Sequence, residues 1–323
     1  MGLVKGSSDY IIKGQKMRKE LFYSAYLSLY RAGILKERIE QAYQILEKCR
    51  LCPRNCGVNR LKGEKGFCRA ESDLVVASAH SHFGEEPPIS GHQGSGTIFF
   101  SYCNLRCVFC QNYPISHLEN GNCISVEKLA EMMVMLQGRG CHNINLVTPT
   151  HFMPQILSAL SLAIEEGLHI PLVYNCGGYE SLEALRLLEG VVDIYLPDIK
   201  YGNENSAKKY SNAPGYFKKA KEAIKEMYNQ VGNLQLDKRG VARRGLLVRH
   251  LVLPNGIAAT REVFSFLARE ISPRIYVSIM SQYFPTHQAK HFPELNRQIT
   301  PDEYEEAMGI AEELNLEKGW KQG

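Results

Sequence analysis

The chain has 323 residues, of which 22% are charged and 44% are hydrophobic, and its formal net charge is +4. This length suits one large globular domain with appendages, or two domains. No apolar run approaches the ~20 residues of a membrane span, residues 1–13 lack the apolar core of a secretory signal, and the small net charge gives no reason to expect nucleic acid. We therefore expect a cytoplasmic protein without membrane or nucleic-acid partners.

Two regions precede the main fold. Apolar residues recur at helical spacing over residues 9–48, which predicts a helical N-terminal extension over residues 1–48. Residues 49–96 are expected to form a cysteine-rich, metal-binding segment followed by a linker. Ten cysteines in a chain of this kind indicate metal ligands rather than disulfides.

The cysteine-rich segment has the spacing Cys49-x2-Cys52-x3-Cys56-x11-Cys68. Four thiolates can complete a structural zinc site or a [4Fe–4S] cluster, and the spacing suits either. Free thiols are the remaining, less favoured alternative.

Six apolar runs of β-strand character follow, and helical patterns fill most of the gaps between them. The runs are Ile98–Tyr102, Ile144–Val147, Ile170–Tyr174, Val192–Leu196, Leu246–Leu253 and Ile275–Met280. Alternating strands and helices predict a parallel sheet with right-handed crossovers. We expect an α/β fold, an incomplete (β/α)6 barrel over residues 97–290, with an open sheet as the alternative. Residues 291–323 are expected to form a C-terminal helical segment, in which Thr300-Pro-Asp-Glu303 is the capping signal that starts a helix.

The first of these runs leads into the motif Cys103-x3-Cys107-x2-Cys110. A [4Fe–4S] cluster is commonly held by four thiolates. Three thiolates on one loop would leave one iron open to bind a small molecule and transfer an electron to it. A zinc site or unpaired surface thiols are the alternatives.

Polar residues stand where the later strands end, the edge at which parallel α/β folds bind ligands. Thr150 could cap the following helix or face a ligand, and the Asp198 and Lys200 side chains lie on one side of an extended chain. A surface ion pair is the alternative for Asp198 and Lys200. Arg249 lies inside an apolar run, and an arginine in a buried strand requires an anion.

Together these motifs resemble the radical S-adenosylmethionine (SAM) superfamily, and within it the pyruvate formate-lyase activating enzyme group, in an uncharacterised branch. The resemblance covers roughly residues 49–305 and rests on the Cys103 loop and Asp198-Ile-Lys200, with further marks at Cys52-Pro-Arg-Asn-Cys-Gly57, Glu86-Pro-Pro-Ile-Ser90, Pro149-Thr-His151 and Leu253-Pro-Asn-Gly256.

The resemblance implies that Cys103, Cys107 and Cys110 ligate a [4Fe–4S] cluster whose open iron binds SAM. The residues that it places near SAM are Phe109, Asn112, Asn175, Cys176, Asp198, Lys200 and Arg249. Activating enzymes usually carry Gly-Gly-Glu after the second strand, where this chain has Thr148-Pro-Thr-His151. Thr148 or Thr150 would then accept a hydrogen bond from the SAM ammonium group.

The expected function is therefore reductive cleavage of SAM to a 5′-deoxyadenosyl radical, which abstracts hydrogen from an unknown substrate, a protein being one candidate. A low-potential donor such as flavodoxin or ferredoxin would supply electrons. One alternative is an activating enzyme for a glycyl radical enzyme. The other is a non-catalytic iron–sulfur or zinc module for interaction or electron transfer.

Overall fold

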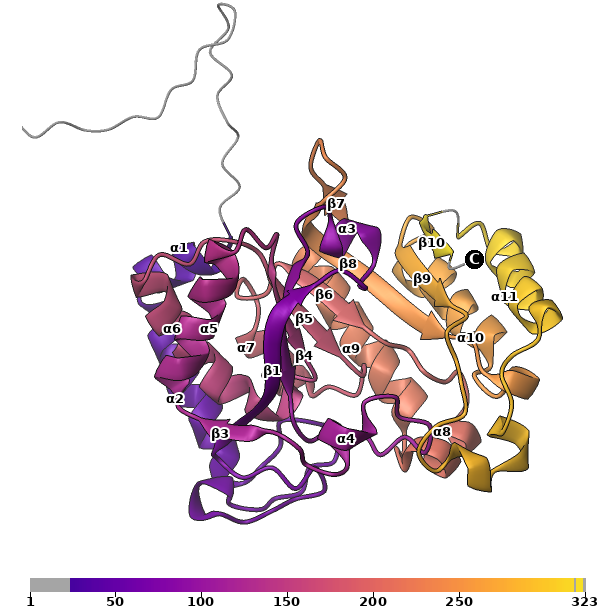
Figure 1. Cartoon of the computed structure of the whole chain (residues 1–323), viewed down its shortest axis with the longest axis horizontal. Helices are drawn as coiled ribbons and strands as arrows, with labels where there is room; N and C mark the ends of the chain where they lie inside the picture. The colour runs from indigo at the N-terminus through magenta and orange to yellow at the C-terminus, as the bar shows by residue number, and fades with distance from the viewer. Residues whose placement is uncertain (1–23, 317, 322–323) are drawn as a thin grey trace, which may run out of the picture.

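The computed structural model describes residues 24–316 and 318–321, and it is built around one ten-stranded sheet (Figure 1). The strand order is β10-β9-β8-β6-β5-β4-β2-β1-β3, and β7 pairs with β8 outside this order. The strands are β1 (Leu74–His82), β2 (Ser95–Phe100), β3 (Asn122–Ile124), β4 (Ile144–Val147), β5 (Leu172–Cys176), β6 (Ile194–Pro197), β7 (Gln235–Leu236), β8 (Ala242–Leu251), β9 (Tyr276–Met280) and β10 (Gly319–Lys321).

The six predicted apolar runs form the parallel centre of the sheet, from β2 through β4, β5, β6 and β8 to β9. The sheet ends at β3 on one side and β10 on the other, so the barrel is incomplete, as the sequence predicts. Strand β1 lies within the predicted linker and pairs antiparallel with β2 and β3. The segment 49–96 is therefore continuous with the sheet at its C-terminal end.

The helices of the described residues are α1 (Tyr26–Arg31), α2 (Ile34–Glu47), α3 (Pro87–Ser90), α4 (Tyr113–Ser116), α5 (Val126–Gly138), α6 (Met153–Glu165), α7 (Leu182–Leu187), α8 (Glu204–Ser211), α9 (Tyr216–Val231), α10 (Thr260–Phe266) and α11 (Pro301–Glu313). Helices pack around the outside of the sheet, with α1, α2, α5 and α6 at the left of Figure 1 and α10 and α11 at the right. The capping box predicted at Thr300 and Glu303 is present at the start of α11. No helix in the described part of the chain is both long and apolar enough to cross a bilayer.

The predicted N-terminal helical extension is two helices where it is described, because Gly33 adopts φ 76° between α1 and α2; residues 9–23 lie outside the described residues. The Asp193 carboxylate fixes this region to the start of β6. It accepts hydrogen bonds from the backbone N–H of Ala25 and of Leu172, both at 3.0 Å. Helix α2 packs on α6 and leads directly into Cys49.

The inner face of the sheet is closed at one end by α3. Ile89 of this short helix is fully buried in a small apolar cluster whose other members come from β5, β6 and β8. The Asn143 side chain donates a 2.8 Å hydrogen bond to the Ile89 carbonyl oxygen and fixes α3 against the sheet.

We expect Ile89→Ala to lower the free energy of unfolding by roughly 2–5 kcal/mol, because it removes buried methyl groups and leaves a cavity inside the sheet. Leu118→Ala is the control, since Leu118 is 60% exposed and its loss should change little. Urea denaturation of both variants checks the prediction. Equal stability of the Ile89→Ala variant and the unmodified chain would show that the Ile89 side chain does not stabilise the core.

Candidate functional site

The motif Cys103-x3-Cys107-x2-Cys110 lies on the loop after β2, at the edge where the parallel strands end. Two backbone hydrogen bonds fix this loop, one to α8 and one within the loop itself. Val108 N–H donates to the Tyr210 carbonyl oxygen of α8 at 2.8 Å, and Cys110 N–H donates to the Cys107 carbonyl oxygen at 3.1 Å. The three thiols are thus held near one another on a loop whose shape is set by α8.

Each of the three sulfur atoms has a hydrogen-bonding partner. These contacts join Leu105 N–H to Cys103 Sγ at 3.3 Å, Ser211 O–H to Cys107 Sγ at 2.9 Å, and Ser116 Oγ to Cys110 Sγ at 3.2 Å. Donors of this kind stabilise negative charge on metal-bound sulfur and tune the potential of an iron–sulfur cluster. Burial raises the pKa of all three thiols, that of Cys107 to about 11, although the Lys200 charge acts in the opposite direction. Bound iron would supply the positive charge that the thiolates need, so the site fits a [4Fe–4S] cluster.

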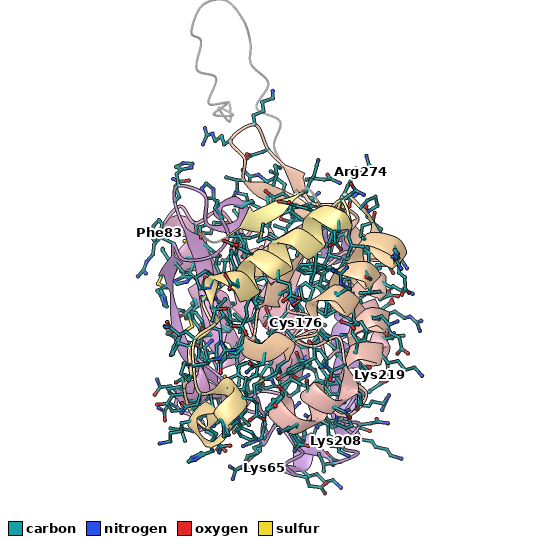
Figure 2. The ribbon with its side chains drawn as sticks, turned by 90° about the vertical axis from the view of Figure 1, so that its right-hand side faces the viewer. Lys65, Phe83, Cys176, Lys208, Lys219 and Arg274 are labelled. Atoms are coloured by element: carbon teal, nitrogen blue, oxygen red, sulfur yellow. The ribbon has the colours of Figure 1, made fainter. Side chains whose placement is uncertain are left out.

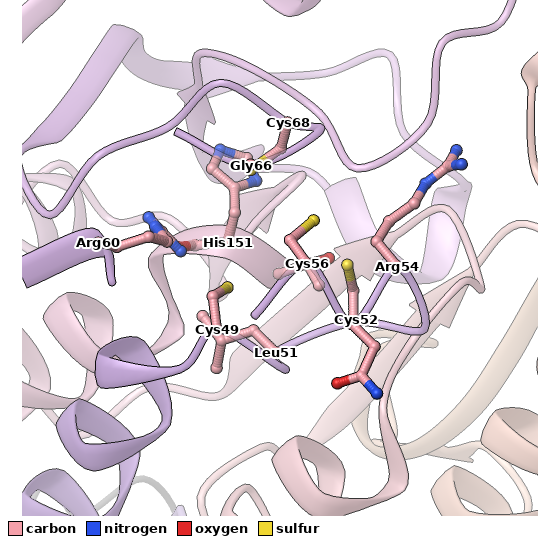
Figure 3. Close-up of a pocket in the computed structure, with 11 residues that line it drawn as sticks. Cys49, Leu51, Cys52, Arg54, Cys56, Arg60, Gly66, Cys68 and His151 are labelled. Carbon is pink, nitrogen blue, oxygen red and sulfur yellow. The ribbon is translucent and has the colours of Figure 1, made fainter. Parts of the chain in front are cut away.

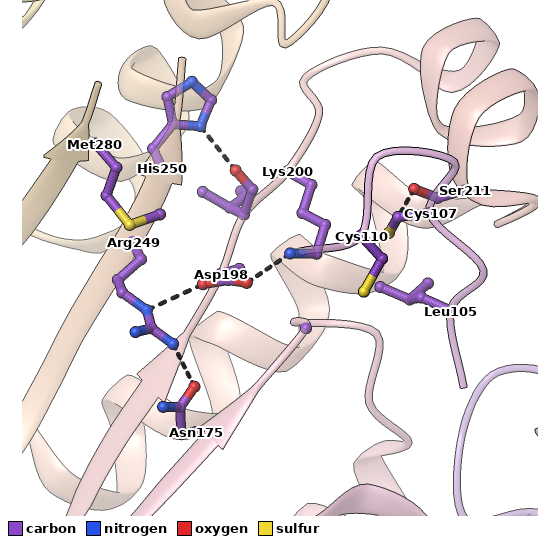
Figure 4. A network of polar contacts seen from close by, with 12 residues as sticks. Leu105, Cys107, Cys110, Asn175, Asp198, Lys200, Ser211, Arg249, His250 and Met280 are labelled. Carbon is purple, nitrogen blue, oxygen red and sulfur yellow. Dashed lines mark hydrogen bonds and ion pairs between the residues drawn. The ribbon is translucent and has the colours of Figure 1, made fainter. Parts of the chain in front are cut away.

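A partly buried ionic network lies beside this loop and is centred on Asp198, directly after β6 (Figure 4). Lys200 Nζ lies 2.5 Å from one carboxylate oxygen of Asp198, and Arg249 Nε lies 3.0 Å from the other. The Arg249 guanidinium also pairs with Glu85 at 3.1 Å and donates to the Asn175 side chain. The anion that the sequence required for Arg249 is therefore provided within the chain, by Asp198 and Glu85.

The charges in this network stabilise one another. Burial alone would raise the pKa of Asp198, but the charges of Lys200 and Arg249 outweigh it and lower that pKa. Burial would lower the pKa of Lys200, but Asp198 and Cys107 raise it, so Lys200 stays protonated. Lys200 lies between Asp198 and the cysteine loop (Figure 4), which places a permanent positive charge beside the three thiols.

The remaining predicted SAM-binding residues divide between different surroundings. Phe109 is buried against Tyr201 and Tyr283. Asn112 is exposed at the start of α4. Thr148 has φ 59° and donates its backbone N–H to the Asn175 carbonyl oxygen at 2.8 Å.

Thr150 and Cys176 face a different buried group, the carboxyl of Glu180. The Thr150 hydroxyl donates to Glu180 at 2.9 Å, and the Tyr174 hydroxyl donates to it at 3.2 Å. Thr150 does not cap α6, whose N-cap position is Phe152. Cys176 lies deep in the interior, away from the lysines at the periphery (Figure 2). The structure thus joins Asn175, Asp198 and Arg249 with Lys200, and groups Thr150 and Cys176 with Glu180.

The four N-terminal cysteines line one common pocket (Figure 3). The backbone N–H of Cys49 donates to the Val58 carbonyl oxygen at 2.8 Å, which closes the loop that carries Cys52 and Cys56. Gly66 packs against this loop so closely that a Cβ there would lie 2.9 Å from Cys56 Sγ. The strand end after β4 completes the wall with Thr150 and His151.

Several residues of these sites carried no recognised signal in the sequence. Ser211 is 104 positions from its partner Cys107 and belongs to the long insertion between β6 and β8. Glu180 follows the Gly177-Gly178 turn, and its position four residues after Cys176 was the one available cue. Arg60 appeared as an ordinary charge in a polar segment, yet it is completely buried.

Comparison with known proteins gives a family match over residues 97–236, to the radical SAM superfamily. An uncharacterized protein of Methanocaldococcus jannaschii is 32% identical over 300 residues, which is 90% of this chain and 82% of that protein.

Among solved structures, the FeFe-hydrogenase maturase HydG from Carboxydothermus hydrogenoformans matches 93% of this chain and 70% of its own at a TM-score of 0.50 and 13% identity. SuiB of Streptococcus suis, solved with SAM bound, matches 69% of this chain at a TM-score of 0.46 and 10% identity, and the chain spans about half (48%) of its length. At 13% identity the likeness to HydG bears on the fold alone.

The Glu180 carboxyl is expected to make the stability of the fold depend on pH. Burial raises its pKa to about 7, above the ordinary 4.5, although hydrogen bonds from Thr150 and Tyr174 lower it. The folded chain therefore binds a proton more tightly than the unfolded chain, so this contribution to stability is complete below pH 4.5 and is lost as the pH rises through about 7. The loss amounts to about 3 kcal/mol.

We expect Glu180→Gln, which cannot ionise, to reduce the fall in stability between pH 4.5 and pH 7.5. Urea denaturation across this range measures it. The control is Glu183→Gln, because the Glu183 side chain is 45% exposed and its substitution should leave the pH profile unchanged. An identical pH profile for Glu180→Gln and the unmodified chain would contradict the prediction.

Proposed function

The chain belongs to the radical SAM superfamily, and we propose that it is an enzyme that reductively cleaves SAM and uses the resulting 5′-deoxyadenosyl radical to abstract hydrogen from a substrate. The observation that carries this proposal is the loop of Cys103, Cys107 and Cys110, whose three sulfur atoms all have hydrogen-bonding partners and lie beside a protonated lysine.

In this proposal the three thiolates hold a [4Fe–4S] cluster, which when bound supplies the electron that breaks the bond between sulfur and the 5′-carbon of SAM. The protein binds and orients SAM and keeps water away. Lys200 uses one ammonium hydrogen on Asp198 and has two others for the SAM carboxylate. Arg249 is engaged through Nε, Nη1 and Nη2 with Asp198, Glu85 and Asn175, which makes it a positioning residue.

The proposed SAM cavity retains Phe109, Asn112, Thr148, Asn175 and Asp198 as further contacts. Thr150 and Cys176 would act there through Glu180, to which both are joined. The substrate is an unidentified molecule, for which a protein remains one candidate. A low-potential flavodoxin or ferredoxin is the proposed electron donor. None of the ten cysteines, all of which are described, forms a disulfide, which suits the reducing cytoplasm that we propose as the compartment.

The narrower role, activation of a glycyl radical enzyme, is not retained as the proposal. It rests on the sequence resemblance, and the sequence departs from that group where Thr148-Pro-Thr-His151 replaces Gly-Gly-Glu. A glycyl radical signal after mixing with a partner enzyme would be needed to restore it.

We expect Cys107→Ala to abolish formation of 5′-deoxyadenosine from SAM and dithionite, because two thiolates cannot hold the cluster with a single open corner. The protein is reconstituted anaerobically with iron and sulfide, and the product is measured by chromatography. Cys123→Ala is the matched control, since Cys123 is exposed on β3. In the unmodified chain, SAM should also change the electron paramagnetic resonance spectrum of the reduced cluster. An unchanged spectrum from a fully loaded cluster would refute the proposed function.

We expect Lys200→Ala to weaken SAM binding about tenfold to a hundredfold, because a charge-assisted hydrogen bond contributes about 1.5–3 kcal/mol. Equilibrium binding to the reconstituted protein measures the change, and Lys200→Met tests whether loss of the charge alone suffices. Lys208→Ala, on the exposed side of α8, is the control. If Arg249→Ala and Lys200→Ala both bind SAM as tightly as the unmodified chain, this network does not bind SAM.

A further inference from the structure

Two arginines flank the four-cysteine pocket and lack a carboxylate partner. Arg60 is fully buried, and its guanidinium donates to two backbone carbonyl oxygens, those of His151 at 2.7 Å and Glu71 at 2.5 Å. The Arg54 guanidinium stacks 3.5 Å from the centre of the Phe67 ring. Among the described residues neither arginine forms an ion pair. A buried cation is costly unless an anion compensates it, so the pocket requires negative charge.

An unpartnered imidazole nitrogen also lines this pocket. His151 is 2% exposed, and its Nε2 lies 2.7 Å from the Ser101 carbonyl oxygen, so Nε2 carries the hydrogen. Its Nδ1 is then a bare acceptor, buried and without a hydrogen-bond partner. The ring lies beside Gly66 and Cys68 in Figure 3. This unpaired nitrogen shows that the polar groups of the pocket are not all satisfied by the described chain.

The arrangement of the side chains suits a cluster, whose thiolates need not converge on one ion. A structural zinc site needs four ligands that converge on one ion, whereas the thiolates of a [4Fe–4S] cluster each bind a different iron. In residues 24–316 and 318–321, no three His, Cys, Asp or Glu side chains converge on one metal ion. This holds equally for the Cys103 loop, where the family implies a cluster.

Arg54 connects the pocket to the loop of Cys103. Its Nε donates to the Asn104 backbone carbonyl oxygen at 3.0 Å, and Asn104 follows Cys103 directly in the chain. The Asn104 side chain in turn donates to the Tyr179 carbonyl oxygen at 2.7 Å, and the Tyr179 ring lies 5.3 Å from the same guanidinium. One arginine side chain therefore lines the four-cysteine pocket and also contacts the loop of Cys103.

We propose that Cys49, Cys52, Cys56 and Cys68 hold a second [4Fe–4S] cluster, lined by His151, that passes electrons to the Cys103 loop across the Arg54–Asn104 contact. A flavodoxin or ferredoxin reduces this cluster by one electron. The cluster returns to its oxidised state when it gives that electron to the cluster of the Cys103 loop. The metal site stands independently, and the direction of electron flow rests on the proposed function.

Metal analysis of matched variants tests the site. Anaerobically reconstituted C103A/C107A/C110A should retain about four irons and four sulfides per chain, and C49A/C52A/C56A/C68A about four fewer irons than the unmodified chain. Cys123→Ala should retain the full content. One zinc and no iron in the triple variant, or undiminished iron in the quadruple variant, overturns the proposal. The triple variant keeps the test decisive if the quadruple variant does not fold.

Paramagnetic resonance and kinetics test the relay. With both clusters reduced, the unmodified chain should show magnetic interaction between them, and a plain sum of the spectra of the two variants would exclude their proximity. After mixing with reduced flavodoxin, C49A/C52A/C56A/C68A should lose the fast reduction of its remaining cluster. Reduction as fast as in the unmodified chain overturns the relay. The response of this variant's spectrum to SAM separately tests the proposed function.

Discussion

The partly buried carboxylate of Asp198 organises the edge of the sheet on which the candidate site is built. Both of its oxygens are occupied, one by Lys200 and one by Arg249. Removing one member of the network would leave the remaining charge uncompensated in a partly buried site. Arg249 carries the network on to β5 through Asn175, and to the segment before α3 through Glu85. The orientation of Lys200 beside the cysteine loop therefore depends on four segments that are far apart in the sequence.

The two groups of cysteines differ in the groups that stabilise their buried thiolates. A buried thiolate is unstable unless positive charge or hydrogen-bond donors surround it. On the Cys103 loop, two serine hydroxyls, one backbone N–H and the Lys200 ammonium group provide this environment. In the N-terminal pocket, Arg54 and Arg60 provide it, with fewer neutral donors.

Much of the fold was predictable because it is recorded in local patterns. The six central strands are continuous apolar runs, since both faces of their sheet are covered, and the capping box at Thr300 needs a few adjacent residues. The cysteine motifs are similarly local. The pairing of β1 with β2 and the burial of Ile89 inside the sheet were not predictable, because both depend on partners distant in the chain.

The same distinction applies to the candidate site. The sequence could place Asp198, Lys200 and Arg249 at strand ends, but it could not show that Glu85 neutralises part of the Arg249 charge. It left Thr150 as a helix cap or a SAM ligand. The structure instead directs its hydroxyl to Glu180, because a buried hydroxyl needs an acceptor and this carboxyl is the one at hand.

The N-terminal cysteine pocket is built jointly by two parts of the chain, which bears on its role. One wall is the segment from Cys49 to Cys68, and the other is Thr150 and His151, directly after β4. Arg60 joins the walls by its hydrogen bond to the His151 carbonyl oxygen. A metal centre bound in this pocket would be held partly by the strand edge that carries the Cys103 loop, and not by the N-terminal segment alone. This geometry favours the proposed electron relay over a role in attaching the protein to a partner.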